Sequence, residues 1–377
     1  MRGASTDLSL SAAEARVGRR TVLVGLGASC ATLGMPRPAA SVEGEALKTI
    51  AAGRGLTYGC AVFEKTLRDD ARMREAVLRE VASIVAGYEM KWRPTAPAEG
   101  RADYRAGDEL LRFATDNGLA LRGHTVVWHQ NPPLWAIPRL HGREGEELVF
   151  AHIRDIMGHY RGRVREWDVV NEAVNVPEGR PDGLRRWGPY ERGYDFLADC
   201  FRVAHEADPD AVLCYNDFGL EYDRIDQAAK RAAVLRLVEA LKARGAPIHA
   251  VGIQSHLIAW YPFSQGVFRK FLADLAGLDL RIRLTELDMN ERKVGGDIGK
   301  RDRFGASLVR RYLDAALDEK AVTGVLTWGL SDSENWLTGY APRLDGLPQR
   351  SMPLDEAFER KPIWYALASA FRNAPSR

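Results

Sequence analysis

Apolar positions alternate between two patterns from about residue 45 onward. Short runs rich in branched and aromatic residues are typical of buried strands, and longer segments with apolar residues three and four apart predict amphipathic helices. The predicted strands span residues 56–63, 83–90, 120–128, 165–172, 211–217, 248–256, 281–288 and 322–329. The predicted helices between them include residues 70–82, 106–118, 193–207 and 227–245. The last of these ends at Gly245, a residue type that commonly terminates helices.

Eight strands that alternate strictly with helices predict one closed (β/α)8 barrel, a TIM barrel, over residues 41–377. An open doubly wound sheet is the alternative. No glycine-rich phosphate loop follows the first strand, which argues against dinucleotide binding. We find no internal repeat, low-complexity linker or second domain, and residues 340–362 form a long proline-rich loop after the last strand.

The first 40 residues follow a different pattern. Arg16, Arg19 and Arg20 precede an uncharged run, residues 21–35, that is too short to span a bilayer. Two adjacent arginines before a mild, Gly- and Ala-rich segment are typical of a twin-arginine signal, and an ordinary secretory signal is the alternative. We therefore expect residues 1–40 to be a signal peptide. The mature protein would be periplasmic or extracellular, without membrane attachment after cleavage.

Charge and cysteine content narrow the range of partners. Without residues 1–40, 48 basic residues face 49 acidic ones, so nothing favours nucleic acid, anionic lipid or a charged polymer as a partner. Cys60, Cys200 and Cys214 each lie in an apolar element and are far apart in the sequence. This spacing predicts buried thiols rather than a disulfide framework or a zinc site.

Polar and aromatic residues gather at the ends of the predicted strands. In a (β/α)8 barrel the carboxyl ends of all strands meet at one rim, where reactive groups stand. The residues at these ends are His124, Trp128, His129, Asn171, Glu172, Asn216, Asp217, Gln254, His256, Glu286, Asp288 and Trp328. Two glutamates across a barrel mouth are what glycoside hydrolysis uses. A retaining mechanism places the two carboxyl groups about 5 to 5.5 Å apart, one ionised as nucleophile and one protonated as acid.

The surroundings of the two glutamates predict different protonation states. Asp288 shares a strand face with Glu286, and a histidine between them, His256, would keep Glu286 ionised. Glu172 follows two valines and stands beside Asn171, a less charged setting that favours the protonated form and the role of proton donor. For either glutamate alone, a structural ion pair with an arginine is the alternative.

Tryptophans predict a sugar substrate. Flat rings at a rim suit the apolar faces of pyranose rings, and indole N–H groups can bond hydroxyls. Of nine tryptophans, five lie at or just after predicted strand ends, namely Trp92, Trp128, Trp260, Trp328 and Trp336. Trp167 lies inside a strand and Trp364 in the last helix, so we expect both to pack in the core.

Seven motifs occur in order along the chain: EMKW (89–92), RGHTVVWH (122–129), WDVVNEA (167–173), YNDF (215–218), GIQSHL (252–257), LTELD (284–288) and TWGLSDSENW (327–336). Over roughly residues 45–375 the chain resembles the family 10 glycoside hydrolases, the endo-β-1,4-xylanases. The resemblance implies a retaining (β/α)8 hydrolase that acts on xylan or xylo-oligosaccharides and needs no metal or organic cofactor. We expect a monomer by default.

The resemblance also implies a role for individual residues. Glu172 matches the acid/base and Glu286 the nucleophile. The residues that match those holding the sugar at the cleavage point are Lys91, His124, Trp128, Asn171, Gln254 and His256. Trp328 and Trp336 match the aromatic walls of the groove. We expect Asn216 and Asp288 to support the two glutamates.

The chain departs from the family pattern at four positions. The family usually carries Glu-Asn before EMKW, where the side chains bind the xylose next outward on the non-reducing side. Gly87 and Tyr88 stand there in this chain. Leu337 replaces a frequent Arg, and Phe218 a frequent Tyr. We expect catalysis to be preserved and the glycone side to be weakened or reshaped, with Tyr88 either stacking on a sugar or blocking the groove.

Three other functions remain open from the sequence. Another β-glycanase of the same clan, acting on mannan or glucan, would share the Asn-Glu pair and the distal Glu, although Lys91 and the RGHTVVWH motif favour xylan. A metal-dependent barrel hydrolase could use His124, His129 and His256, but the usual His-x-His pair is missing from the first strand. A carbohydrate-binding barrel that has lost turnover is the third alternative. The presence of both carboxylates argues against it, and tight xylan binding without release of reducing sugar would identify it.

Overall fold

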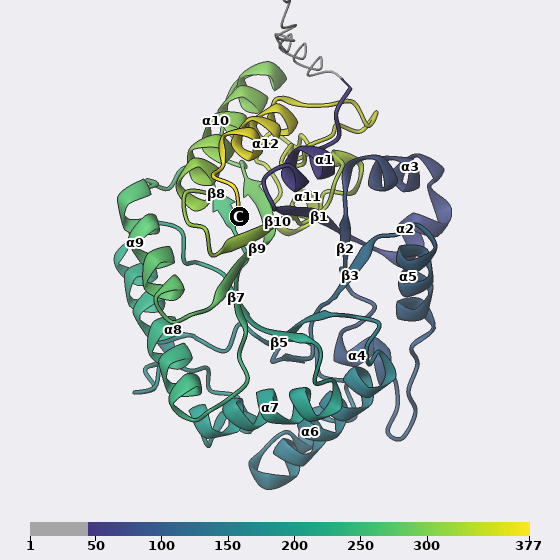
Figure 1. Cartoon of the computed structure of the whole chain (residues 1–377), viewed down its shortest axis with the longest axis vertical. Helices are drawn as coiled ribbons and strands as arrows, with labels where there is room; N and C mark the ends of the chain where they lie inside the picture. The colour runs from purple at the N-terminus through teal and green to yellow at the C-terminus, as the bar shows by residue number, and fades with distance from the viewer. Residues whose placement is uncertain (1–43) are drawn as a thin grey trace, which may run out of the picture. The chain divides into compact units, whose positions relative to one another are not determined.

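The computed structural model describes residues 44–377. These residues contain ten parallel-paired strands and twelve α-helices, joined by loops and short 3-10 turns. The predicted signal peptide, residues 1–40, lies outside them. Eight strands form a closed ring in the order β10-β1-β2-β3-β5-β6-β7-β9, and β9 pairs with β10 to close it. Figure 1 looks into this ring, with the helices arranged around its outside. The predicted (β/α)8 barrel is confirmed.

Each predicted strand is present in the ring. The ring strands are β1 (Thr57–Val62), β2 (Ser83–Ala86), β3 (Ala120–Gly123), β5 (Glu166–Asn171), β6 (Val212–Asp217), β7 (Ala250–Ile253), β9 (Arg281–Asn290) and β10 (Val322–Thr327). Two predicted strands are interrupted near their ends. The chain continues after β3 as β4 (Val127–Trp128), which pairs with β5, and after β7 as β8 (His256–Ile258), which pairs with β9. The break after β7 contains Ser255 with φ 64°, a left-handed conformation that a strand cannot hold.

The longer helices cover the outer face of the ring (Figure 1). The α-helices of residues 44–377 are α1 (Leu47–Ala52), α2 (Glu64–Asp69), α3 (Ala71–Glu80), α4 (Trp92–Thr95), α5 (Arg105–Asp116), α6 (Gly142–His159), α7 (Tyr194–Ala207), α8 (Ile225–Ala243), α9 (Gln265–Ala276), α10 (Ile298–Ala316), α11 (Leu337–Tyr340) and α12 (Pro362–Asn373). The carboxylate of Asp70 caps α3 by accepting from the backbone N–H groups of Arg72 and Met73. Gly245, with φ 64°, ends α8.

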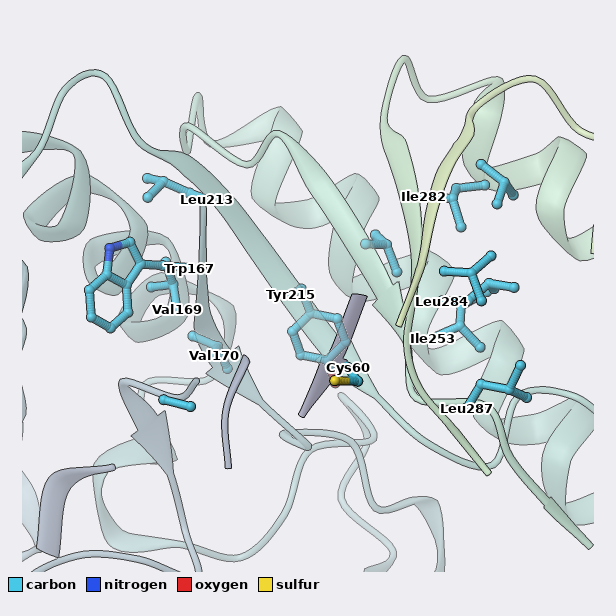
Figure 2. Packing of buried hydrophobic residues seen from close by; sticks show 14 of the residues in the cluster. Cys60, Trp167, Val169, Val170, Leu213, Tyr215, Ile253, Ile282, Leu284 and Leu287 are labelled. Atoms are coloured by element: carbon cyan, nitrogen blue, oxygen red, sulfur yellow. The ribbon is translucent and has the colours of Figure 1, made fainter. Parts of the chain in front are cut away.

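The core fills the barrel and the layer between strands and helices. Parallel strands covered on both faces are apolar almost throughout, and Leu213, Ile282 and Leu284 pack in this way (Figure 2). Trp167 and Trp364 are fully buried, as predicted. The thiols of Cys60, Cys200 and Cys214 are free and buried, which confirms that prediction also.

The long loop after α11 is held by buried charges. The guanidinium of Arg343 donates to the backbone carbonyl of Glu291, and that of Arg350 pairs with Asp302 at 2.9 Å. Arg301 on α10 donates through Nε to the Glu291 carboxylate at 3.0 Å. The loop is thereby fixed beside α10 and the end of β9. Among residues 44–377, no helix is both long and apolar enough to cross a membrane.

Candidate active site

Glu172 stands directly after β5 in an unusual backbone conformation. Its φ is 57°, a left-handed conformation that costs a residue other than glycine on the order of 1–3 kcal/mol. Its N–H donates to the carbonyl of Asn216 at 2.9 Å, and its carbonyl accepts from Arg185 Nε at 2.8 Å. These bonds from the neighbouring strand and the following loop hold the turn that takes Glu172 out of the strand at the rim.

The carboxyl group of Glu172 is buried and has neutral donors. Oε2 accepts from Trp128 Nε1 at 2.9 Å and Oε1 from Gln254 Nε2 at 3.1 Å. Burial raises the pKa of Glu172, and the negative charges of Asp217 and Glu286 raise it further against the lowering effect of the two hydrogen bonds. A group in this setting holds its proton more readily than an ordinary glutamate.

Glu286, on β9, has the opposite balance. Its side chain is also buried, but Oε1 accepts from Asn216 Nδ2 at 2.8 Å and Oε2 lies 3.3 Å from His256 Nε2. Burial opposes ionisation, and the hydrogen bond with His256 together with the charges of His124 and His256 outweighs it, so the pKa of Glu286 is lowered. The two glutamates therefore favour different protonation states in one site.

His256 lies between two carboxylates. Its Nδ1 is 2.9 Å from Asp288 Oδ1, and Asp288 Oδ2 accepts from Trp336 Nε1 at 2.6 Å. Burial opposes protonation of His256, but the charge of Asp288 and the bonds with both carboxylates raise its pKa well above the usual value. Asp288 thus keeps a positive charge beside Glu286 and orients Trp336.

Asn216 connects the two glutamates. Its Nδ2 donates to Glu286 and also to Asn171 Oδ1 at 2.9 Å, and its Oδ1 accepts from Thr285 at 2.7 Å. Gln254, the donor to Glu172, also lies 3.3 Å from Asn171 Oδ1. The amide is accommodated because residue 252 is glycine, since a Cβ there would lie 2.2 Å from Asn216 Oδ1. One network of hydrogen bonds therefore fixes both carboxyl groups.

Lys91 and two tryptophans form a cationic and aromatic wall. Lys91 Nζ lies 4.8 Å from the ring centre of Trp128 and 5.8 Å from that of Trp328, and the side chain is buried. Burial lowers the pKa of Lys91, and the charges of Glu286 and Glu172 act against that shift. The ring of His124 meets Trp328 edge-on at 5.2 Å. The structure thus brings together the two predicted catalytic glutamates and the ten residues predicted to bind the sugar or to support the glutamates.

Two further residues support the site in ways that the sequence did not predict. Asp168, inside β5, accepts from His124 Nδ1 at 2.9 Å and from buried Arg122 at 2.5 Å, so it orients a histidine of the site. A charged residue within a buried strand was the available signal. Asp217, fully buried beside the site, was noted at a strand end without the role in raising the pKa of Glu172.

The prediction that Trp92 lies at the rim as a sugar-binding ring is wrong. The side chain is buried and stacks on the ring of His152, with centres 4.7 Å apart. Strand β2 ends at Ala86, earlier than expected, and Trp92 opens the short helix α4 instead. Trp128, Trp260, Trp328 and Trp336 remain partly exposed.

The histidines of the metal alternative have separate partners. His124 bonds to Asp168 and His256 to Asp288, while burial and the charge of Arg185 lower the pKa of His129 to about 4. Within the described part of the chain, no group of three or more His, Cys, Asp or Glu side chains is arranged to hold a metal ion.

A (β/α)8 barrel whose rim holds two buried glutamates with pKa values shifted in opposite directions has the arrangement of glycoside hydrolases that work through two carboxyl groups. The sequence profile described as Glycosyl hydrolase family 10 matches residues 46–370. The chain belongs to this family.

Curated relatives and solved structures agree with this membership. The chain is 32% identical over 309 residues to endo-1,4-beta-xylanase B of Thermotoga neapolitana, covering 80% of this chain and 84% of the relative. It is 35% identical over 266 residues to a beta-1,4-xylanase of Dictyoglomus thermophilum, covering 68% and 72%. Native xylanase 10B from Thermotoga maritima superposes with a TM-score of 0.78 at 29% identity, covering 86% of this chain and 98% of that one. The Thermotoga petrophila xylanase 10B in complex with xylobiose gives the same score and identity, covering 86% and 97%.

Proposed function

We propose that this chain is an endo-1,4-β-xylanase that hydrolyses internal β-1,4-xylosidic bonds with retention, with Glu286 as nucleophile and Glu172 as acid/base. The opposite pKa shifts of the two glutamates within one hydrogen-bond network carry the assignment of roles. Family membership and the xylanase relatives support the substrate.

In the first step Glu286 attacks the anomeric carbon of a xylosyl residue. The bond from that carbon to the glycosidic oxygen breaks, and Glu172 gives its proton to the departing oxygen. The glycone is then esterified to Glu286, and Glu172 is a carboxylate. Asn216 and His256 hold the nucleophile before attack through their contacts with its two oxygens.

The second step reverses the roles. Esterification removes the negative charge of Glu286, which is one of the causes that raise the pKa of Glu172. Glu172 therefore becomes more acidic at this stage and can remain ionised until it takes a proton from water. The water oxygen attacks the anomeric carbon, the ester bond to Glu286 breaks, and the configuration at that carbon is retained.

The side chains around the two glutamates suit a neutral sugar chain. Lys91, His124 and Gln254 supply hydrogen-bonding groups, and Trp128, Trp328 and Trp336 supply partly exposed rings. The reaction as proposed routes no step through a metal or organic cofactor.

The charged and apolar pattern of residues 1–40 supports export to the periplasm or beyond. If the signal is of the twin-arginine type, replacing Arg19 and Arg20 with Lys would abolish export.

Assays of purified protein on xylan, mannan and carboxymethyl-cellulose test the substrate. We expect reducing sugar from xylan, and NMR of the first products should show the retained β-anomer. Faster release from mannan or carboxymethyl-cellulose would identify another β-glycanase of the clan, and tight xylan binding without release would identify a binding protein. Rates on long linear xylan and on short xylo-oligosaccharides then separate a stacking Tyr88 from a groove that Tyr88 blocks.

A further inference from the structure

Strand β8 has a neighbouring strand on one edge only. It pairs with β9, where His256 lies opposite Asp288 and Ile258 opposite Asn290. Ile258 turns its N–H and its carbonyl to the other edge, where no strand of the described chain pairs with β8. Backbone groups at such an edge need other hydrogen-bond partners.

Two adjacent residues in the loop after β6 bond to this free edge of β8. Oε1 of Glu221 accepts from the N–H of Ser255 at 3.1 Å. The hydroxyl of Tyr222 accepts from the N–H of Ile258 at 2.7 Å and donates to the Ile258 carbonyl at 3.0 Å. The two side chains thus take the place of a strand and hold the backbone on both sides of His256.

The bond from Glu221 falls on the residue that departs from strand geometry. Ser255 has φ 64°, a left-handed conformation that strains a residue other than glycine. Its hydroxyl donates to the Ile253 carbonyl at 3.0 Å and lies 2.7 Å from the hydroxyl of Tyr312. This turn separates β8 from β7 and thereby sets where His256 stands.

The carboxylate of Glu221 acts as a hydrogen-bond acceptor for backbone groups. The residue is 1% exposed, and its second oxygen accepts from the N–H of Leu220 at 2.8 Å. Burial raises the pKa of Glu221, and the backbone donors and the charges of His256 and Lys230 act against that shift. Its bonds are therefore to the backbone of β8 and of its own loop.

His256 connects β8 to the nucleophile of the proposed function, on which this inference rests. Its Nε2 lies 3.3 Å from Glu286 Oε2, and its Nδ1 lies 2.9 Å from Asp288 Oδ1. A shift of the β8 backbone would disturb both contacts at once. The charged and titratable groups around His256 are Asp288, Glu286 and Glu221, and Glu286 also interacts with His124, Asp168 and Lys91.

We propose that Glu221 and Tyr222 are positioning residues for the reaction, because they fix the backbone of β8 so that His256 stays between Glu286 and Asp288. Their polar groups bond to backbone atoms and not to either catalytic glutamate. Both residues therefore act on the nucleophile through His256.

A double-mutant cycle with His256→Ala separates this role from a general loss of stability. Glu221→Gln replaces one acceptor oxygen with a donor, and Tyr222→Phe removes only the hydroxyl. Each should lower kcat/KM on an aryl β-xylobioside by roughly tenfold, because a displaced His256 no longer holds the nucleophile in place. In the His256→Ala background each should lower it by no more than about twofold, because the contact that they secure is already gone.

The pH profile gives a second readout. In Glu221→Gln and Tyr222→Phe the acidic side of kcat/KM should move to higher pH, because a displaced His256 lowers the pKa of Glu286 less. Glu80→Gln is the matched control. Glu80, at the end of α3, is also buried and accepts a backbone N–H, that of Leu47, at 3.0 Å, so its replacement should leave the profile in place.

Melting temperatures show which variants fold, and Tyr222→Phe, which keeps the ring, carries the cycle if Glu221→Gln does not. Equal losses of kcat/KM with and without His256, or folded variants as active as the wild type, would overturn this inference alone. A folded wild type that does not cleave the aryl xylobioside would overturn the proposed function with it.

Discussion

Glu172 and Glu286 carry carboxyl groups of one chemical type, and their neighbours decide which of them keeps a proton. Glu172 has two neutral donors, Trp128 and Gln254, and a buried negative neighbour in Asp217. Glu286 has a positively charged histidine on one oxygen. Removing the charge of one residue next to either glutamate should therefore shift the pKa of that glutamate. One side of the profile of kcat/KM against pH should move, and the other side should stay in place.

Asp288→Asn should move the acidic side of the profile to higher pH. Without the Asp288 charge the pKa of His256 falls, so less positive charge faces Glu286 and the pKa of Glu286 rises. The ionised nucleophile is then lost at a higher pH than in the wild type. The measurement is kcat/KM against pH on an aryl xylobioside. An acidic side that stays in place or moves to lower pH would contradict the role given to Asp288.

Asp217→Asn should move the basic side of the profile to lower pH. The Asp217 charge is one of the causes that raise the pKa of Glu172, and the change leaves its partner, Lys230, positive at 2.7 Å from the former carboxylate. Glu172 would then lose its proton at lower pH. The same titration measures this, with Asp288→Asn as the reciprocal control. A basic side that shifts upward would rule out this account of Glu172.

At the scale of elements, glycines in the strands let neighbouring side chains approach closely, and short strand extensions place further site residues. Gly252 on β7 admits the Asn216 amide, and Gly123 at the end of β3 faces the ring of Trp167. The extensions β4 and β8 add Trp128 and His256 above the ring by pairing with β5 and β9. Small residues in the ring and paired extensions above it therefore both determine where the functional side chains lie.

Gly123→Ala should destabilise the fold by roughly 1–3 kcal/mol or more, because overpacking forces buried groups to move. The new Cβ would lie 2.1 Å from the fully buried Trp167 ring. Gly158→Ala is the control, since no atom lies within 4 Å of its Cβ and alanine favours helix α6 by up to about 1 kcal/mol. Urea unfolding measures both. A Gly123→Ala variant as stable as the wild type would mean that the contact is not as tight as described.

At the scale of the whole molecule, buried ion pairs connect the last third of the chain. Arg301→Met should cost about 3–5 kcal/mol, because the carboxylate of Glu291 would remain buried with less compensation. Lys270→Met removes an exposed pair with Asp274 and should cost no more than about 1 kcal/mol. Urea unfolding again measures the difference, and limited proteolysis should cut residues 341–361 faster in Arg301→Met. Equal stability of the two variants would show that the buried pair contributes little.

The barrel and the two glutamates could be predicted because both follow from local periodicity and from the rule that parallel strand ends meet at one rim. The breaks after β3 and β7 could not, because they depend on pairing with β5 and β9. The contact of Asp168 with His124 could not be predicted, because Asp168 lies inside an otherwise apolar strand. The place of Trp92 could not be predicted, because β2 ends at Ala86 and the chain turns before Trp92 begins α4.

The proposed mechanism depends on Glu286 acting as the nucleophile and Glu172 as the acid/base. Azide rescue of Glu286→Ala and Glu172→Ala, with an aryl xylobioside as substrate, tests these two roles most directly. Glu286→Ala with azide should give the inverted glycosyl azide, because azide displaces the leaving group once. Glu172→Ala should give the retained azide, because azide attacks the ester on Glu286. The same stereochemistry from both variants, or activity undiminished in either, would contradict the assignment.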